Sequence, residues 1–522
     1  MMSYLLVILS AVLCGISFPT VLFGAKLPNL GFLAWIGLVP FLISLRGVSL
    51  RGIFVRSFVF GLGIYFISLY WIYNVLSTFG HLSVATTICA MFIMMSMFAA
   101  YIALGVMLAV WCARRLSLSP LTLLPFFWVA MDFARNYFPF NGFPWSAIAY
   151  SQYGYTSLIA IADTISVYGI TFLIIALNVI LAEVVLIAGQ RRFLSCVKIL
   201  VPIVLIFVVM TSVGKFKISE MKNDNKTANV VLVQGNIPQS IKWNKEMART
   251  NLLRYRDVTL ASASLEPDLV IWPEAAFPYI IAKDETSIDP RMLGMDAQSN
   301  KTDLVMGVIA DGGGDDNYNR AIVVDNTGTI KSSYDKMHLV PFGEYVPLEH
   351  VLFFVRAIAS AVGKTLPGNI LEPLVTTSGK LGMLICYEDI FPQIARTLTK
   401  EGADMLAVIT NDAWFGNSSA AYQHMAFSVF RAVETHRSVV RAANTGVSAI
   451  IAPWGEVMDA SSIFKTETLR GRVLLRYDTS TYVKYGDWFA WLIVALSIVF
   501  VILALGKKGI LQDDKERSII KA

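Results

Sequence analysis

The stretch Leu384-Ile385-Cys386-Tyr387-Glu388-Asp389 is an apolar run that ends on a cysteine and continues into a tyrosine and two carboxylates. The other four cysteines, at positions 14, 89, 112 and 196, lie in or beside long apolar runs, so Cys386 stands alone in the polar part of the chain. A solitary cysteine is most often a small buried hydrophobe. The end of a strand, the adjacent charges and the lack of a disulfide partner favour a reactive thiol instead. We therefore treat Cys386 as a candidate nucleophile.

The composition is that of a membrane protein. Of the 522 residues, 56% are hydrophobic and only 15% are charged, and the mean hydropathy is +0.60, which is atypical of soluble domains. The net charge is +6, and the basic residues lie in short clusters between apolar runs rather than along one face. This distribution is typical of membrane topology and argues against nucleic-acid binding.

Eight apolar runs are long enough to cross the bilayer as helices of about 20 residues each. They cover residues 4–24, 29–45, 53–74, 83–112, 118–134, 158–188, 193–213 and 488–506. Basic residues follow the second, fourth, sixth and eighth runs, whereas the opposite connections carry little more than Lys26 and Arg135. By the positive-inside rule both termini are expected to be cytoplasmic. The segment between the seventh and eighth runs then faces outward, into the periplasm of a bacterium with an inner membrane.

The polar segment 221–480 alternates short runs rich in β-branched residues with helical stretches. Strands are expected at 229–233, 268–272, 303–308, 321–325, 381–385, 405–410 and 447–452, and helices at 245–263, 391–400 and 419–441. The chain is thus expected to comprise a seven-helix membrane domain (1–215), an α/β domain (221–480), a last membrane helix (487–507) and a cytoplasmic tail (508–522). It has no Walker sequence, dinucleotide fingerprint or zinc-ligand spacing, so we expect no metal and no cofactor.

Three clusters at expected strand ends carry ionisable groups. They are Ile271–Glu274, Tyr334–His338 with its continuation Pro341–Tyr345, and Cys386–Glu388. Each cluster alone is weak evidence for a catalytic site, because a Glu or Lys side chain is usually exposed to solvent at the surface. Together they supply what acyl transfer through a cysteine requires: a carboxylate to take the thiol proton and a fixed cation to stabilise the oxyanion.

In these contexts Glu274, Lys336 and Cys386 resemble the Glu-Lys-Cys triad of the nitrilase, or carbon-nitrogen hydrolase, superfamily. The resemblance extends over the whole α/β segment and implies an α-β-β-α sandwich. More specifically, the chain resembles the apolipoprotein N-acyltransferase family, which has the same order of seven spans, nitrilase-like domain and final span. The motifs that carry this resemblance are Val233–Gln239 with Lys242-Trp243, Val340–Pro347, Cys386–Glu388 and Asn141–Trp145.

The resemblance implies a role for each site residue. Glu274 is expected to be the general base, Lys336 the oxyanion stabiliser and Cys386 the nucleophile. Glu344 is expected beside Lys336, where it would help to hold the lysine's charge and geometry. The remaining expectations are that Tyr387 and Glu388 shape the pocket and position its donors, and that Trp243 positions substrate.

The implied reaction has two steps. Cys386 attacks an acyl ester of a phospholipid, expected to be phosphatidylethanolamine, and forms a thioester. The free α-amino group of a diacylglyceryl-modified N-terminal cysteine on a lipoprotein then takes the chain as an amide. The membrane helices would hold the pocket near the bilayer, and the apolar segment Val351–Val362 is expected to be either a core helix or an arm that dips into the headgroups.

Three alternatives remain open at this point. A Cys-His mechanism could use His338 or His424, although no carboxylate that would orient either histidine is evident from the sequence. A membrane-tethered amidase or nitrilase would pass its acyl group to water. A channel, carrier or scaffold would place polar residues inside the spans, which hold few, mainly Asp132 and Glu183.

Overall fold

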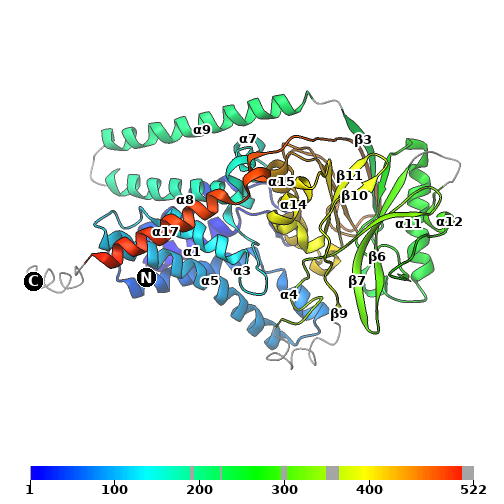
Figure 1. Ribbon diagram of the computed structural model, residues 1–522. Helices are drawn as coiled ribbons and strands as arrows, with labels where there is room; N and C mark the ends of the chain where they lie inside the picture. The colour runs from blue at the N-terminus through cyan, green and yellow to red at the C-terminus, as the bar shows by residue number, and fades with distance from the viewer. Residues whose placement is uncertain (1, 189–192, 224–225, 296–301, 348–363, 508–522) are drawn as a thin grey trace, which may run out of the picture.

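The computed structural model describes residues 2–188, 193–223, 226–295, 302–347 and 364–507. A bundle of helices occupies one end of the molecule, and two β-sheets with their covering helices occupy the other (Figure 1). The expected segment Val351–Val362 lies outside the described residues.

The helical bundle contains long and short helices. They are α1 (Met2–Gly15), α2 (Val39–Ser44), α3 (Leu50–Ser68), α4 (Ile72–Asn74), α5 (Val84–Arg115), α6 (Leu124–Arg135), α7 (Thr156–Ile159), α8 (Ala162–Ala188), α9 (Phe193–Met221) and α17 (Trp488–Gly506). Among the described residues, five of these helices, α3, α5, α8, α9 and α17, are long and apolar enough to cross a membrane. The expected number of eight spans therefore stays a prediction.

Two of the expected spans are shorter in the structure. The run 4–24 is helical only to Gly15, and Val21–Leu22 (β1) then pairs with Ala25–Lys26 (β2). The residue before a proline avoids the helical region, so Pro19 does not allow the helix to continue. The run 29–45 breaks into a 3₁₀ turn (η1, Gly31–Trp35) and α2, with Pro40 in the first turn of α2, where a proline is tolerated.

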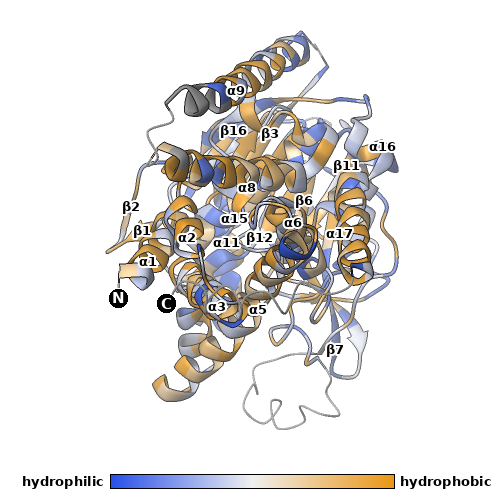
Figure 2. Cartoon of the chain, turned by 90° about the vertical axis from the view of Figure 1, so that its left-hand side faces the viewer, coloured by the Kyte–Doolittle hydropathy of each residue, from blue (hydrophilic) through white to orange (hydrophobic). Residues whose placement is uncertain are grey.

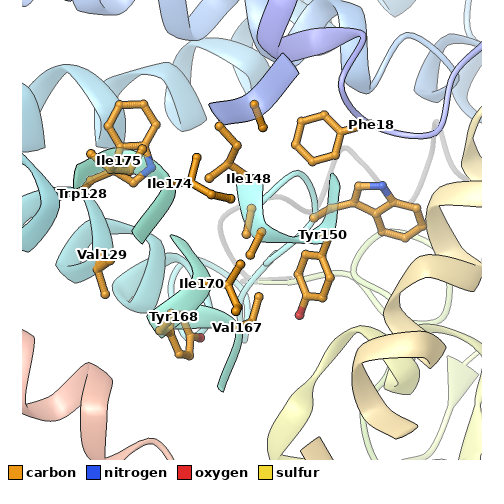
Figure 3. Close-up of a cluster of buried hydrophobic side chains, with 14 of the residues drawn as sticks. Phe18, Trp128, Val129, Ile148, Tyr150, Val167, Tyr168, Ile170, Ile174 and Ile175 are labelled. Atoms are coloured by element: carbon orange, nitrogen blue, oxygen red, sulfur yellow. The ribbon is translucent and has the colours of Figure 1, made fainter. Parts of the chain in front are cut away.

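The bundle is apolar both inside and outside. Its interior includes a packed cluster from α6, α8 and the 3₁₀ turn η3 (Ile148–Gln152), in which Trp128, Ile148, Tyr150 and Ile174 are buried (Figure 3). Hydrophobic residues also run along α1, α8 and α17 (Figure 2), and outward-facing side chains such as Ile502 on α17 are exposed. Side chains that are apolar on every face suit a helix surrounded by lipid.

Basic side chains gather at the end of the bundle that is remote from the sheets. The Arg56 guanidinium lies 5.7 Å from the ring centre of Tyr4, near the start of α1. Arg115, at the end of α5, donates to the carbonyl of Lys507, just after α17, at 3.0 Å. The start of α1 and the end of α17 thus lie with the basic residues (Figure 1).

The α/β part has two sheets. The first has the order β10 (Leu374–Thr376), β11 (Gly379–Ile385), β12 (Met405–Thr410), β13 (Val439–Ala443), β14 (Ala449–Ile451) and β15 (Val457–Ala460). The second has the order β16 (Glu467–Leu474), β3 (Thr227–Gln234), β4 (Leu269–Ile271), β6 (Asp303–Gly313), β7 (Asp316–Val324) and β8 (Ile330–Asp335), with β5 (Ile280–Ile281) and β9 (Lys364–Thr365) paired beside this path.

The sheets pack face to face between two helical layers. Residues of both sheets, including Leu232, Met383 and Ala407, form one buried cluster. The helices α14 (Pro392–Lys400) and α15 (Ala420–Thr435) cover the first sheet on the side of the bundle, and α11 (Ala248–Ser262) with α12 (Pro290–Leu293) lies beyond the second (Figure 1). The expected α-β-β-α sandwich is therefore confirmed.

The expected helix 419–441 is wrong at its carboxyl end. The helix α15 stops at Thr435 because His436 adopts a left-handed conformation, with φ of 56°. The chain then enters strand β13, where Val440 pairs with Ala407 of β12 and with Ile450 of β14. A buried central strand suits β-branched residues such as Val439 and Val440.

Candidate active site

The predicted site residues follow strands whose ends meet between the two sheets. Glu274 lies three residues after β4, Lys336 directly follows β8, and Cys386 directly follows β11. β4 runs parallel to β6, and β6 and β8 both run antiparallel to β7 between them, so the carboxyl ends of β4 and β8 lie at the same edge of the second sheet. Glu274 and Lys336 are buried and Cys386 is half-buried.

Lys336 is a buried cation held between two carboxylates. Its Nζ atom lies 2.9 Å from Glu344 Oε1 and 3.7 Å from Glu274 Oε1. Only 1% of the lysine side chain is exposed. Burial would lower the pKa of Lys336, but Glu344, followed by Glu274, raises it above the ordinary lysine value. The lysine is therefore a fixed positive charge at this point.

Both carboxylates are oriented by neutral donors. Glu274 Oε1 accepts from the amide of Asn319 at 2.7 Å, and its Oε2 accepts from the backbone N–H of Asn411 at 2.9 Å. The Asn319 amide also donates to Glu344 Oε1 at 3.2 Å, and Glu344 Oε2 accepts from the Val340 N–H at 2.8 Å. These donors aim one oxygen of each carboxylate at Lys336.

Cys386 sits on a tight turn between β11 and the 3₁₀ turn η5 (Cys386–Ile390), with a backbone φ of 53°. A residue with a side chain rarely adopts this conformation, which costs about 1–3 kcal/mol and is frequent at functional sites. Burial, followed by the charge of Glu274, raises the pKa of the Cys386 thiol, while Lys336 acts to lower it. The resting side chain is therefore a neutral thiol.

Glu388 joins the strand ends that carry Lys336 and Cys386. Its Oε1 accepts from the Tyr334 hydroxyl at 2.8 Å and from the N–H groups of Met337 and His338 at 2.8 and 3.1 Å. Its Oε2 accepts from the Ile385 N–H at 2.8 Å. The fully buried carboxylate thus fixes the backbone on both sides of the site.

Tyr387 points toward the helical bundle. Its hydroxyl donates to the carbonyl of Gly142 at 3.0 Å, and its ring packs edge-on against Phe391. Gly142 belongs to the loop after α6, so Tyr387 connects the turn at Cys386 to the helical bundle.

Trp243 and Lys242 lie at the end of a short helix, α10 (Gln239–Lys242). The Trp243 side chain is half exposed, at 52%. Lys242 is buried, and its Nζ donates to the backbone carbonyl of Glu274 at 2.9 Å. Burial lowers the pKa of Lys242 to about 8, against the opposing charge of Glu274.

The two histidines do not match the Cys-His alternative. The His338 ring lies against Phe391, with 3.8 Å between ring centres, and burial, followed by Lys336, lowers its pKa to about 4. His424 is engaged at both nitrogens, with Nδ1 2.9 Å from Asp412 Oδ1 and Nε2 3.1 Å from the backbone carbonyl oxygen of Cys386. The expectation that neither histidine has an orienting carboxylate is wrong for His424.

Several residues of the site had no role in the sequence analysis. Asn319 lies inside β7 and no motif marks it. Asn411 and Asp412 directly follow β12, and Lys242 precedes the expected Trp243, but their contacts depend on the fold. Among the described residues, no group of three or more His, Cys, Asp or Glu side chains could hold a metal ion.

Two family models match the chain. Residues 229–477 match the carbon-nitrogen hydrolase model, and residues 10–180 match the model of the apolipoprotein N-acyltransferase N-terminal domain. Among solved structures, the chain is similar to Saccharomyces cerevisiae Nit3, described as a member of branch 10 of the nitrilase superfamily. That similarity has 20% identity and a TM-score of 0.37, and it covers 48% of this chain and 91% of Nit3.

Curated relatives match over most of the chain. The apolipoprotein N-acyltransferase of Geobacter metallireducens is 36% identical over 97% of this chain and 96% of its own length. Those of Methylococcus capsulatus and Shewanella oneidensis are 33% and 31% identical, covering 88% and 82% of this chain and 86% and 83% of their own lengths. The chain therefore belongs to the apolipoprotein N-acyltransferase family of enzymes.

Proposed function

We propose that this enzyme N-acylates lipoproteins by a ping-pong mechanism that passes through a thioester on Cys386. The donor is a phospholipid, with phosphatidylethanolamine as the expected species. The acceptor is the free α-amino group of a diacylglyceryl-modified N-terminal cysteine. One observation carries the proposal: a buried lysine lies between two carboxylates, and the Glu388 carboxylate joins the backbone just after this lysine to the backbone just before Cys386.

In the first step Glu274 takes the proton of the Cys386 thiol as the sulfur attacks the ester carbonyl of the phospholipid. The raised pKa of the thiol supports this assignment, because an unassisted thiol would remain protonated near neutral pH. Lys336 stabilises the negative oxygen of the tetrahedral intermediate. The carbon–oxygen bond then breaks, and Glu274 returns the proton to the leaving lysophospholipid.

In the second step the amine of the acceptor attacks the thioester carbonyl. Glu274 accepts the proton that the amine loses and passes it to the Cys386 sulfur as the carbon–sulfur bond breaks, so the acyl chain leaves as an amide and the neutral thiol is restored. The hydrogen bonds from Asn319 and Asn411 support this double use of Glu274, because they hold its carboxylate in one orientation through both steps. Glu344 keeps Lys336 charged throughout.

The proposed arrangement in the cell is a multi-pass protein of the bacterial inner membrane. Residues 1–215 and 487–507 would span the membrane, residues 221–480 would form the periplasmic catalytic domain, and both termini would be cytoplasmic. The cluster of basic residues near Tyr4 and Lys507, at the end of the bundle away from the sheets, supports this orientation. Trp243 is proposed to contact substrate, since it is half exposed beside Lys242.

A labelled phospholipid tests the proposal. The enzyme is incubated with phosphatidylethanolamine that carries a labelled acyl chain, and the peptide that contains Cys386 is analysed by mass spectrometry. The expected result is one acyl chain on Cys386 in the wild type and none in Cys386→Ala. An unlabelled Cys386, or label that appears only as free fatty acid when a lipoprotein acceptor is present, would contradict the transferase and favour the hydrolase alternative.

A further inference from the structure

The positive φ of Cys386 requires contacts that hold the turn in place. The side chain of the residue is only half-buried, so packing alone does not fix it. The Cys386 carbonyl oxygen lies on the same peptide unit as the Tyr387 N–H, and its direction depends on the torsion angles of Cys386. A group that binds this oxygen therefore also sets the direction in which the thiol points.

His424 binds that oxygen from helix α15. Its Nε2 atom lies 3.1 Å from the Cys386 carbonyl oxygen, and a carbonyl oxygen only accepts, so Nε2 carries the proton and donates. The histidine side chain is 1% exposed. The donor of this hydrogen bond is therefore shielded from water, although the turn that accepts it is part-buried.

The other side of the imidazole ring is fixed by Asp412. Nδ1 lies 2.9 Å from Asp412 Oδ1, and the second carboxylate oxygen accepts from Arg441 at 3.0 Å. Burial would raise the pKa of Asp412, but Arg441, followed by His424, lowers it to about 2. The carboxylate is therefore ionised near neutral pH, and it holds the orientation of the imidazole ring from the Nδ1 side.

The helix that carries His424 is attached to the bundle at the preceding residue, Gln423. The side-chain oxygen Oε1 of Gln423 accepts from the indole N–H groups of Trp71 and Trp145 at 3.2 and 2.8 Å. Its amide donates to the carbonyls of Pro19 and Ser68 at 3.2 and 3.0 Å. The position of His424 along α15 is thus set by three separate segments of the bundle.

We propose that His424 is a positioning residue for Cys386: its Nε2–H holds the Cys386 carbonyl, and through it the strained turn that presents the thiol. Asp412 orients the ring, and Gln423 transmits the position of the membrane helices to it. The histidine acts on the backbone, and it takes no proton from the thiol. The inference rests on the proposed function in one respect, because it assumes that Cys386 is the nucleophile.

Two substitutions separate the two contacts of the ring. The amide nitrogen of Gln reaches the place of Nε2, so His424→Gln keeps a donor for the Cys386 carbonyl and loses the bond to Asp412. The amide of Asn reaches only the place of Nδ1, so His424→Asn keeps the bond to Asp412 and loses the carbonyl contact. Each variant is assayed in full-length enzyme for single-turnover acylation, for the rate of Cys386 alkylation by iodoacetamide, and for its unfolding midpoint.

The expected result is that His424→Asn slows acylation by about 10- to 100-fold in kcat with little change in the KM for the donor lipid, whereas His424→Gln stays within about fivefold of the wild type. The rate of Cys386 alkylation should likewise fall more in His424→Asn than in His424→Gln. Equal rates in the two variants, or a slower Gln than Asn variant, would overturn the proposal. Should the Asn variant not fold, a folded Gln variant that is slowed more than about tenfold overturns it alone.

The two readouts separate this inference from the proposed function. If Cys386 acquires no acyl chain in the wild type, the proposed function fails, and the alkylation rates still report whether His424 positions the thiol. If the wild type is acylated and the two variants behave alike, the function stands and the role of His424 is refuted.

Discussion

Replacing Glu344 by Gln is expected to slow the acylation of Cys386 by about 10²- to 10³-fold. The reason is the charge balance around Lys336. At an effective dielectric constant of about 20, the contact at 2.9 Å with Glu344 is worth roughly 6 kcal/mol and the contact at 3.7 Å with Glu274 somewhat over 4 kcal/mol. Loss of Glu344 removes more than half of the attraction that keeps the buried lysine charged and in place.

The net effect is smaller than the Coulomb energy. The amide oxygen of the substituted side chain can still accept one hydrogen bond, and breaking one partner of a buried ion pair generally costs about 3–5 kcal/mol. Lys336 would also move toward Glu274, which would weaken the base and misplace the oxyanion donor. Loss of one oxyanion donor generally lowers kcat by about 10²- to 10³-fold, which is the range expected here.

The assay is single-turnover transfer of a labelled acyl chain to Cys386, followed by mass spectrometry, with the unfolding midpoint of each variant measured in the same detergent. Glu456→Gln is the matched control, because Glu456 pairs with Lys222 at 3.8 Å while both side chains are about half exposed. An exposed pair contributes little, so this variant should acylate at the wild-type rate. A folded Glu344→Gln enzyme within threefold of the wild type would refute the reasoning.

Three further predictions concern buried groups of the site. Because burial raises the pKa of the Cys386 thiol, the rate of its alkylation by iodoacetamide should keep rising above about pH 10 in the folded enzyme. A rate that levels off by about pH 10, as expected for an ordinary cysteine in the denatured chain, would contradict this. The pKa of Lys242 is lowered to about 8, so between about pH 8 and 10.5 the unfolded chain binds more protons than the folded one. The free energy of unfolding of the wild type, measured with a chemical denaturant, should therefore rise by on the order of 3 kcal/mol relative to that of Lys242→Met across this range. A difference between the two that does not change with pH would count against the prediction. In Glu388→Gln one carboxylate oxygen is replaced by an NH2 group that faces backbone N–H groups such as that of Ile385. The free energy of unfolding should therefore fall by about 1–3 kcal/mol, whereas the control Glu401→Gln, at the exposed end of α14, should unfold like the wild type. Equal unfolding midpoints of the two variants would exclude the proposed role of Glu388.

The strand ends of the site could be predicted from the sequence because apolar β-rich runs stop at ionisable residues. The runs before Glu274 and Cys386 are short, buried and bounded by charges, which is a local signal. The family resemblance then related Lys336 and Glu344 to them. Local patterns of this kind depend only on neighbouring residues, so they can be recognised without knowledge of the fold.

Contacts that depend on strand pairing could not be predicted. Asn319 lies near Glu274 because β7 pairs with β6, which lies beside β4. It lies near Lys336 because β7 also pairs with β8, and the Lys336 N–H donates to the Asn319 carbonyl at 2.8 Å. His424 reaches the Cys386 carbonyl only because α15 packs on the first sheet. The end of α15 was also missed, since the left-handed conformation of His436 has no signature in the residue itself.

The central claim is that the acyl chain passes from Cys386 to an amine. The most direct test isolates the enzyme after acylation with labelled phospholipid, removes the free lipid, and adds a peptide whose N-terminal cysteine carries a diacylglyceryl group. The account predicts that the label leaves Cys386 and appears as an amide on the peptide α-amino group, with one chain transferred per enzyme, and that a peptide with a blocked α-amino group leaves the thioester in place. Label that stays on Cys386 with the free peptide, or that leaves only as fatty acid, would contradict the account.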